Sequence, residues 1–261
     1  MGSALLGTTS FTSWHVALLI GAGVAAGMFN GVAGGGSLIS FPVLLGLGYP
    51  ALTANITNTV GIWPGYLSSA AGYKREISGQ WGRLLRLSPV GLAGAVVGSI
   101  LLLTTPSAEF TRIAPWLVLG ASLLFAFQPL LKRALGEGTT TPSRWHPFFL
   151  MTGTFVAAIY GGYFGAGMGV MLLAILGLFL PDSITRTSGL RTLLSILING
   201  VAAIVFLIHG GLVVEAVVLL AIGSVVGGWF GARVAVSIPA VALRTVVVVV
   251  GLGTAVKLLF F

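Results

Sequence analysis

The sequence predicts an all-α polytopic membrane protein with two inverted-topology repeats, each holding a glycine-broken helix and a short half-helix or re-entrant arm. Three observations predict this fold: an apolar composition, a glycine break that occurs twice, and a pattern of basic residues that reverses between the halves. Of 261 residues, 56% are hydrophobic and 7% are charged, whereas ordinary domains carry about 25% charged residues. The apolar runs are continuous rather than alternating, which favours membrane helices over a β-barrel.

The first half contains four long apolar segments, at residues 14–33, 51–72, 87–104 and 113–131. Between the first two lies the glycine run 34–36, which breaks a helix because each interior glycine costs about 1 kcal/mol relative to alanine. The following segment, 38–48, is too short for a bilayer core that needs about 20 residues, so we expect a half-helix or re-entrant arm. The span at 51–72 is unusually polar at its start.

The second half repeats this order. Residues 147–164 lead into a glycine break, a short segment at 170–180 ends at Pro181, and spans follow at 188–208, 216–230 and up to residue 259. Shifting the halves by 131 positions places Gly34 on Gly165, Gly36 on Gly167 and Pro50 on Pro181. One offset thus matches both the glycine break and the proline that ends the short segment. We therefore predict a repeat at 1–131, a cytoplasmic connector at 132–146 and a repeat at 147–261.

Basic residues predict the orientation. Loop 73–86 and connector 132–146 are rich in Lys and Arg, so both are expected in the cytoplasm. In the second half, loop 209–215 has neither Lys nor Arg, whereas loop 231–244 has Arg233 and Arg244. Each half then crosses the membrane an odd number of times, which makes the repeats inverted, a pattern typical of secondary transporters. We expect a multi-pass protein of the cell (plasma or inner) membrane with both termini outside the cytoplasm.

Several functions are disfavoured by what the sequence contains. The net charge of +8 comes from Lys and Arg in short loops, so we attribute it to membrane topology and expect no nucleic-acid partner. There is no cysteine, and every acidic residue lies in a loop or at a segment end, so we expect no metal and no cofactor. No serine-nucleophile motif, histidine cluster or phosphate-binding loop appears, which argues against an enzyme.

The short arms that begin near Ser37 and Gly169 would present free backbone N–H groups and positive helix-dipole ends. Two such termini facing each other form an anion site, so the expected partners are a small anionic substrate and the lipid bilayer. No feature of the sequence indicates an oligomeric state. The candidate substrate-binding residues are Asn30, Gly34, Gly35, Gly36, Ser37, Asn55, Thr57, Asn58, Gly165, Gly167, Gly169, Arg186, Ser188 and Arg191.

Structural alternatives to these roles stay open. Glycines four residues apart, such as Gly23 and Gly27, are interpreted as helix-packing contacts. Arg186 lies near the predicted cytoplasmic side, where a topological role is equally compatible with its position. Asn55 and Asn58 could instead tie helices together, and helix bonding is the favoured role of Asn199.

The paired motifs resemble the TauE/SafE family of sulfite exporters, within the 4-toluene sulfonate uptake permease superfamily. The residues that carry the resemblance are Gly27, Gly31, Gly34–Ser37, Pro42 and 54–58 in the first half, and Gly161, Gly165, Gly167, Gly169 and Ser188 in the second. The resemblance implies a permease for sulfite, sulfoacetate or other organosulfonates. An anion leaving a negative interior gains about 2.3 kcal/mol per 100 mV, which favours export. A passive anion channel and a proton-coupled importer are the alternatives.

Overall fold

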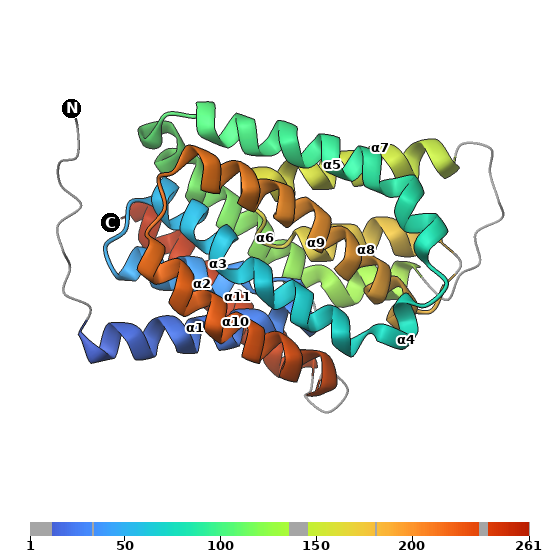
Figure 1. Cartoon of the computed structure of the whole chain (residues 1–261), viewed down its shortest axis with the longest axis horizontal. Coiled ribbons are helices and arrows are strands. Elements are labelled where there is room, and N and C mark those ends of the chain that lie inside the picture. Colours follow the sequence, from blue (N-terminus) through green and yellow to red (C-terminus); the bar gives the residue numbers. More distant parts are fainter. Residues whose placement is uncertain (1–11, 33, 136–145, 181, 235–239, 261) are drawn as a thin grey trace.

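In the computed structural model of the chain, the described residues are 12–32, 34–135, 146–180, 182–234 and 240–260. Every regular element among them is a helix, which confirms the predicted fold class of an all-α polytopic membrane protein (Figure 1). The helices are α1 (Ser13–Val32), α2 (Ser37–Gly46), α3 (Ala51–Gly72), α4 (Lys74–Ile77), α5 (Trp81–Thr104), α6 (Ser107–Leu135), α7 (His146–Tyr163), α8 (Met168–Phe179), α9 (Ile184–His209), α10 (Val214–Val234) and α11 (Ala240–Phe260).

Five of the helices, α1, α5, α6, α9 and α10, are long and apolar enough within the described residues to cross a membrane. α3 has 22 residues and is also of spanning length, but its polar residues make it less apolar. Those polar side chains are turned inward, since Asn55, Thr57, Asn58 and Thr59 are all buried. A polar face buried in the bundle is tolerated in a membrane because it does not contact lipid.

Small residues hold the long helices together in two parallel pairs. α1 packs on α10, where a Cβ added at Gly23 would lie 2.5 Å from the carbonyl oxygen of Leu220. α7 packs on α5, where a Cβ added at Gly94 would lie 2.6 Å from the carbonyl oxygen of Phe155. The backbones are therefore too close for any side chain larger than hydrogen, and the predicted packing role of these glycines is confirmed.

The two glycine breaks turn the chain into two hairpins of the same kind. Three backbone hydrogen bonds of the first break recur in the second at the offset of 131 residues. The first break has Gly34 N to Phe29 O, Ile39 N to Gly36 O and Ser40 N to Gly36 O. The second has, in the same order, Gly165 N to Tyr160 O, Val170 N to Gly167 O and Met171 N to Gly167 O. Gly34 and Gly165 share a positive φ, +80° and +79°, which glycine adopts without strain. The local geometry thus matches the internal duplication expected from the sequence.

The helix contacts follow the same correspondence between halves. α1 contacts α10 while its counterpart α7 contacts α5, and α2 contacts α11 while its counterpart α8 contacts α6. In Figure 1, α1 begins at the left end of the bundle and α7 begins at the right end, so the two helices run in opposite directions. The inversion of the repeats across a bilayer, and the side on which the termini lie, stay predictions.

Several boundaries of the predicted spans are wrong; α6, for example, begins at Ser107 rather than at residue 113. Residues 81–86 were assigned to a loop because they contain Arg83 and Arg86, but they form the first turns of α5, which begins at Trp81. Long arginine side chains can leave the end of a membrane helix for water while their stems stay on it, so charge alone does not mark a loop there. Most of the predicted connector 132–146 lies outside the described residues, because α6 ends at Leu135 and α7 begins at His146.

Candidate functional site

The two breaks meet inside the bundle. A Cβ added at Gly34 would lie 2.6 Å from the Cα of Gly169, and a Cβ added at Gly169 would lie 2.5 Å from the Cα of Gly34. Since α2 begins at Ser37 and α8 begins at Met168, the amino-terminal ends of both short helices lie close to this crossing point. First-turn N–H groups of both helices bond carbonyls of the breaks, as Ile39 N does with Gly36 O and Val170 N with Gly167 O. The helix dipole still makes this end of each helix positive.

A buried arginine lies at the same crossing point. Arg191 is about two turns into α9 and is only 1% exposed. Its Nη2 donates to the carbonyl oxygens of Asn30, at 3.2 Å, and Gly31, at 3.3 Å, in the last turn of α1. Its Nη1 has no hydrogen-bond partner, and a Cβ added at Gly34 would lie 3.2 Å from it. One edge of the guanidinium therefore stabilises the end of α1, and the other edge faces the break.

This arginine has no carboxylate partner among the described residues. Among the described residues, Asp182 pairs with Arg83 and Arg186, and Glu109 pairs with Arg112. Burying an unpaired cation costs several kcal/mol, and the carbonyl groups at the end of α1 compensate only part of its charge. The site is therefore electrostatically suited to an anion.

Two buried asparagines extend the site from α1 to α3. Asn30 Oδ1 accepts a hydrogen bond of 2.8 Å from Gly36 N, and Asn58 Oδ1 accepts one from Ser40 Oγ. In both residues the Nδ2 amide is buried without a partner in the described structure, as is Arg191 Nη1. More than about 90% of buried polar groups in proteins are hydrogen-bonded, so three unpaired donors in one connected cluster are unusual. Unpaired donors of this kind suit an oxyanion, which is a strong hydrogen-bond acceptor.

Asn55 lies at the second break. Its Nδ2 donates to the carbonyl oxygen of Tyr163, the last residue of α7, at 2.9 Å, and its Oδ1 is buried without a partner. Ser37 and Ser188 are buried near the start of α2 and in α9. Thr57 lies apart from the cluster, because its Oγ1 accepts from Val213 N, just before α10.

The other break glycines are in close contact with protein. A Cβ at Gly35 would overlap the ring of Phe125, and one at Gly36 would overlap the carbonyl of Ala26. A Cβ at Gly167 would lie 3.2 Å from the Cβ of Ala121, and one at Gly165 would lie 3.5 Å from Asn199 Oδ1. These glycines let the hairpins pack closely and bring the backbone into the site.

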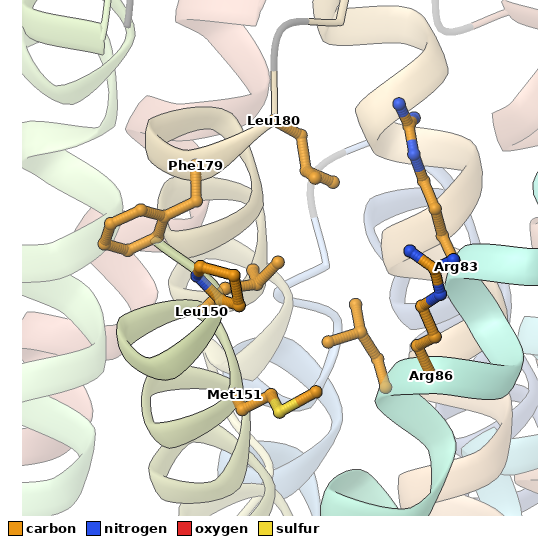
Figure 2. Close-up of a pocket in the computed structure, with 8 residues that line it drawn as sticks. Arg83, Arg86, Leu150, Met151, Phe179 and Leu180 are labelled. Carbon is orange, nitrogen blue, oxygen red and sulfur yellow. The ribbon is translucent and has the colours of Figure 1, made fainter. Parts of the chain in front are cut away.

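A pocket lies elsewhere, between α5, α7 and α8 (Figure 2). Its walls include Arg83, Arg86, Leu87, Leu150 and Phe179, and none of the residues in the crossing-point cluster lines it. We place the candidate site at the crossing point because the buried cation and the unpaired donors are there, whereas the pocket is largely apolar.

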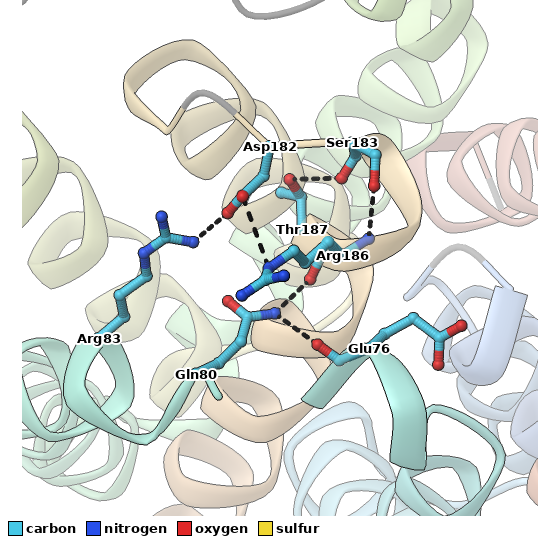
Figure 3. A network of polar contacts seen from close by, with 7 residues as sticks. All are labelled: Glu76, Gln80, Arg83, Asp182, Ser183, Arg186 and Thr187. Atoms are coloured by element: carbon cyan, nitrogen blue, oxygen red, sulfur yellow. Dashed lines mark hydrogen bonds and ion pairs between the residues drawn. The ribbon is translucent and has the colours of Figure 1, made fainter. Parts of the chain in front are cut away.

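Arg186 is not part of the cluster. Its side chain is 47% exposed, and its Nε lies 3.6 Å from Asp182 Oδ1. Figure 3 shows Asp182 between Arg83 and Arg186, while Gln80 Nε2 donates to the carbonyl oxygens of Glu76 and Arg186. This network joins α4 and α5 of the first half to the start of α9 in the second.

Sequence reasoning missed three hydroxyl groups that stabilise the breaks. Tyr73 donates to Gly31 O at 2.7 Å, Tyr160 donates to Ala166 O at 2.6 Å, and Ser40 bonds Asn58. The sequence pattern places Tyr73 in a loop and Tyr160 in an apolar run. The only available signal was the position of Tyr160 five residues before Gly165, which matches Phe29 before Gly34.

The family model described as sulfite exporter TauE/SafE matches residues 19–258, nearly the whole chain. The chain belongs to the TauE/SafE family. TauE/SafE relatives include a probable membrane transporter protein, ORF9, from a Sinorhizobium species, 27% identical over 94% of this chain and 92% of its own. A probable membrane transporter protein of Haemophilus influenzae is 26% identical over 94% of both chains.

A third relative is the probable membrane transporter protein YfcA of Escherichia coli K12, which is 24% identical over 90% of this chain and 86% of its own. Family and relatives agree that this TauE/SafE protein is a membrane transporter and not an enzyme. The resemblance noted in the sequence is thereby confirmed.

Proposed function

We propose that this transporter moves small sulfur-containing anions, such as sulfite, sulfoacetate or other organosulfonates, out of the cell through the site where the two breaks meet. The observation that carries the proposal is Arg191, a fully buried guanidinium with an unpaired Nη1 beside Gly34 and no carboxylate partner among the described residues. An unpaired buried cation in a membrane is costly and is usually retained for function.

A sulfite or sulfonate group fits the chemistry of this site. Its three oxygens can accept hydrogen bonds from several directions, and the unpaired donors, Arg191 Nη1, Asn30 Nδ2 and Asn58 Nδ2, come from α9, α1 and α3. Charge-assisted hydrogen bonds of this type are roughly twice as strong as neutral ones. The amino-terminal ends of α2 and α8 add a positive potential from both halves.

The direction follows from the membrane potential and from the acidic residues. A monovalent anion leaving a negative interior gains about 2.3 kcal/mol per 100 mV, equivalent to about a fiftyfold gradient at about 1.4 kcal/mol per tenfold. The described acidic residues lie at helix ends or in the short helix α4, namely Glu76, Glu109, Asp182 and Glu215. Since none of these lies in the interior of a long helix, where a coupling ion would be bound, export driven by the potential is the simplest mechanism.

Contacts across the halves favour a carrier over an open channel. Gly34 and Gly169 touch backbone to backbone, and the Asp182 network joins the halves near one end. An anion can pass only if one half moves relative to the other, as in transporters that alternate access around a fixed site.

The proposal is tested by anion flux from liposomes that contain the purified protein, with an imposed membrane potential. We expect saturable efflux of sulfite or sulfoacetate that follows the potential without a proton or sodium gradient. Flux that requires a proton gradient would indicate the coupled importer, and flux that never saturates would indicate the channel. No flux of either anion would contradict the proposed substrates.

A further inference from the structure

The pocket between α5, α7 and α8 combines charge with apolar walls. It has a volume of about 240 Å³ and lies where α5 and α7 begin and α8 ends. Figure 2 shows Arg83 and Arg86 on the α5 side, opposite Leu150 and Met151 of α7 and Phe179 of α8. A ligand for this pocket must therefore be anionic at one end and apolar at the other.

The two arginines are not equivalent. Arg83 pairs with Asp182, which it shares with Arg186, so its charge is compensated in part. Arg86 is exposed and makes no ion pair with any described residue. Its guanidinium keeps a full positive charge and free N–H groups on the wall of the pocket, which suits a phosphate group.

The surroundings of the pocket are those of a lipid-facing surface. The neighbouring side chains of Leu85, Phe148 and Met151 are 68%, 59% and 39% exposed, and in a membrane-spanning protein such side chains contact lipid. Trp81, in the first turn of α5, is 61% exposed, and tryptophans at the ends of membrane helices typically lie at the level of the lipid headgroups. The pocket therefore opens at headgroup depth.

The inner wall of the pocket is apolar. Leu87 is buried in an apolar cluster that also contains Leu172 and Leu190, and Leu190 precedes Arg191 in α9. Anions do not cross such a wall readily because the charge would lose its hydration. The pocket is thus better suited to a ligand that enters from the membrane than to the transported anion.

From these observations we propose that the pocket binds an anionic phospholipid. The phosphate contacts Arg86, and the acyl chains run along the apolar faces of α5 and α7. The volume is below the roughly 300 Å³ of the smallest drug-sized sites, so the pocket takes the headgroup and leaves the chains in the bilayer. Basic pockets between membrane helices on the cytoplasmic side bind anionic lipids in this way, and the basic residues Lys74, Arg75, Arg83 and Arg86 predict that side here.

Native mass spectrometry of delipidated protein in detergent tests this inference, with phosphatidylglycerol and phosphatidylcholine titrated separately. We expect one phosphatidylglycerol to bind more tightly than phosphatidylcholine, and Arg86→Gln to weaken its binding about fivefold or more. Met151→Trp, which fills the apolar wall, should lower its occupancy as well. The control is Arg112→Gln, in the first turns of α6, whose arginine pairs with Glu109.

Equal binding of the two lipids, or an unchanged affinity in Arg86→Gln, would overturn the inference. Displacement of phosphatidylglycerol by sulfite would also overturn it, since the pocket would then belong to the anion route. These results are independent of the proposed function, because Arg191→Gln should abolish flux without changing the lipid affinity.

Discussion

Replacing Arg191 by glutamine should weaken sulfite binding about a hundredfold. Glutamine retains a donor and much of the side chain but removes the charge. The free Nη1 can give two hydrogen bonds to an oxyanion, and each bond to a charged group contributes about 1.5–3 kcal/mol. A loss of about 3 kcal/mol corresponds to roughly a hundredfold at about 1.4 kcal/mol per tenfold.

The assay must separate binding from folding, because Arg191 Nη2 also bonds Asn30 O and Gly31 O. We would measure sulfite affinity by titration calorimetry and stability by thermal unfolding on the same samples. Arg191→Lys keeps the charge, but a lysine cannot bond the carbonyls of α1 and an anion at the break at the same time. Its affinity for sulfite should therefore be intermediate. Arg112→Gln should bind sulfite as the wild type does. A folded Arg191→Gln variant with wild-type affinity would refute the reasoning.

Three further predictions concern the architecture. Gly169→Ala should lower the free energy of unfolding by about 1–3 kcal/mol through overpacking, since its Cβ would lie 2.5 Å from the Cα of Gly34. The control Gly46→Ala, whose Cβ would have no atom within 4 Å, should not lower it. Thermal unfolding compares the two variants, and equal effects would mean that the breaks are loosely packed. Tyr73→Phe should cost about 1 kcal/mol, because its hydroxyl donates to the end of α1; an unchanged denaturant midpoint would remove that role. Since the chain has no cysteine, single Arg75→Cys and Glu215→Cys variants should react with an impermeant maleimide from the cytoplasmic and outer sides respectively; labelling from one common side would contradict the inverted repeats.

The sequence was informative about the breaks and less so about the ends of the helices. Gly34 and Gly165 could be matched because glycine has a distinct backbone role, and the same offset relates their hydrogen bonds in the structure. The start of α5 was missed because Arg83 and Arg86 resemble loop charges. Nothing in a single sequence distinguishes a loop arginine from one at the water-facing end of a helix.

The candidate residues were separated by contacts that only the fold determines. Arg186 and Arg191 both lie in α9. An α-helix has about 3.6 residues per turn, so side chains five residues apart point in directions that differ by about 140° around the helix axis. Arg191 therefore reaches the end of α1, whereas Arg186 reaches Asp182 at the surface. The bond from Ser40 to Asn58 likewise joins two helices, and spacing along the chain contains no signal for such a contact.

The central claim is that the crossing of the two breaks binds the transported oxyanion. The most direct test is an experimental structure of the protein with selenite, the selenium analogue of sulfite, located by its anomalous scattering. Our account predicts a selenium peak within hydrogen-bonding reach of Arg191 Nη1 and Asn30 Nδ2, next to the contact between Gly34 and Gly169. A peak only in the pocket beside Arg86, or binding of selenite in solution with no peak at the crossing point, would contradict it.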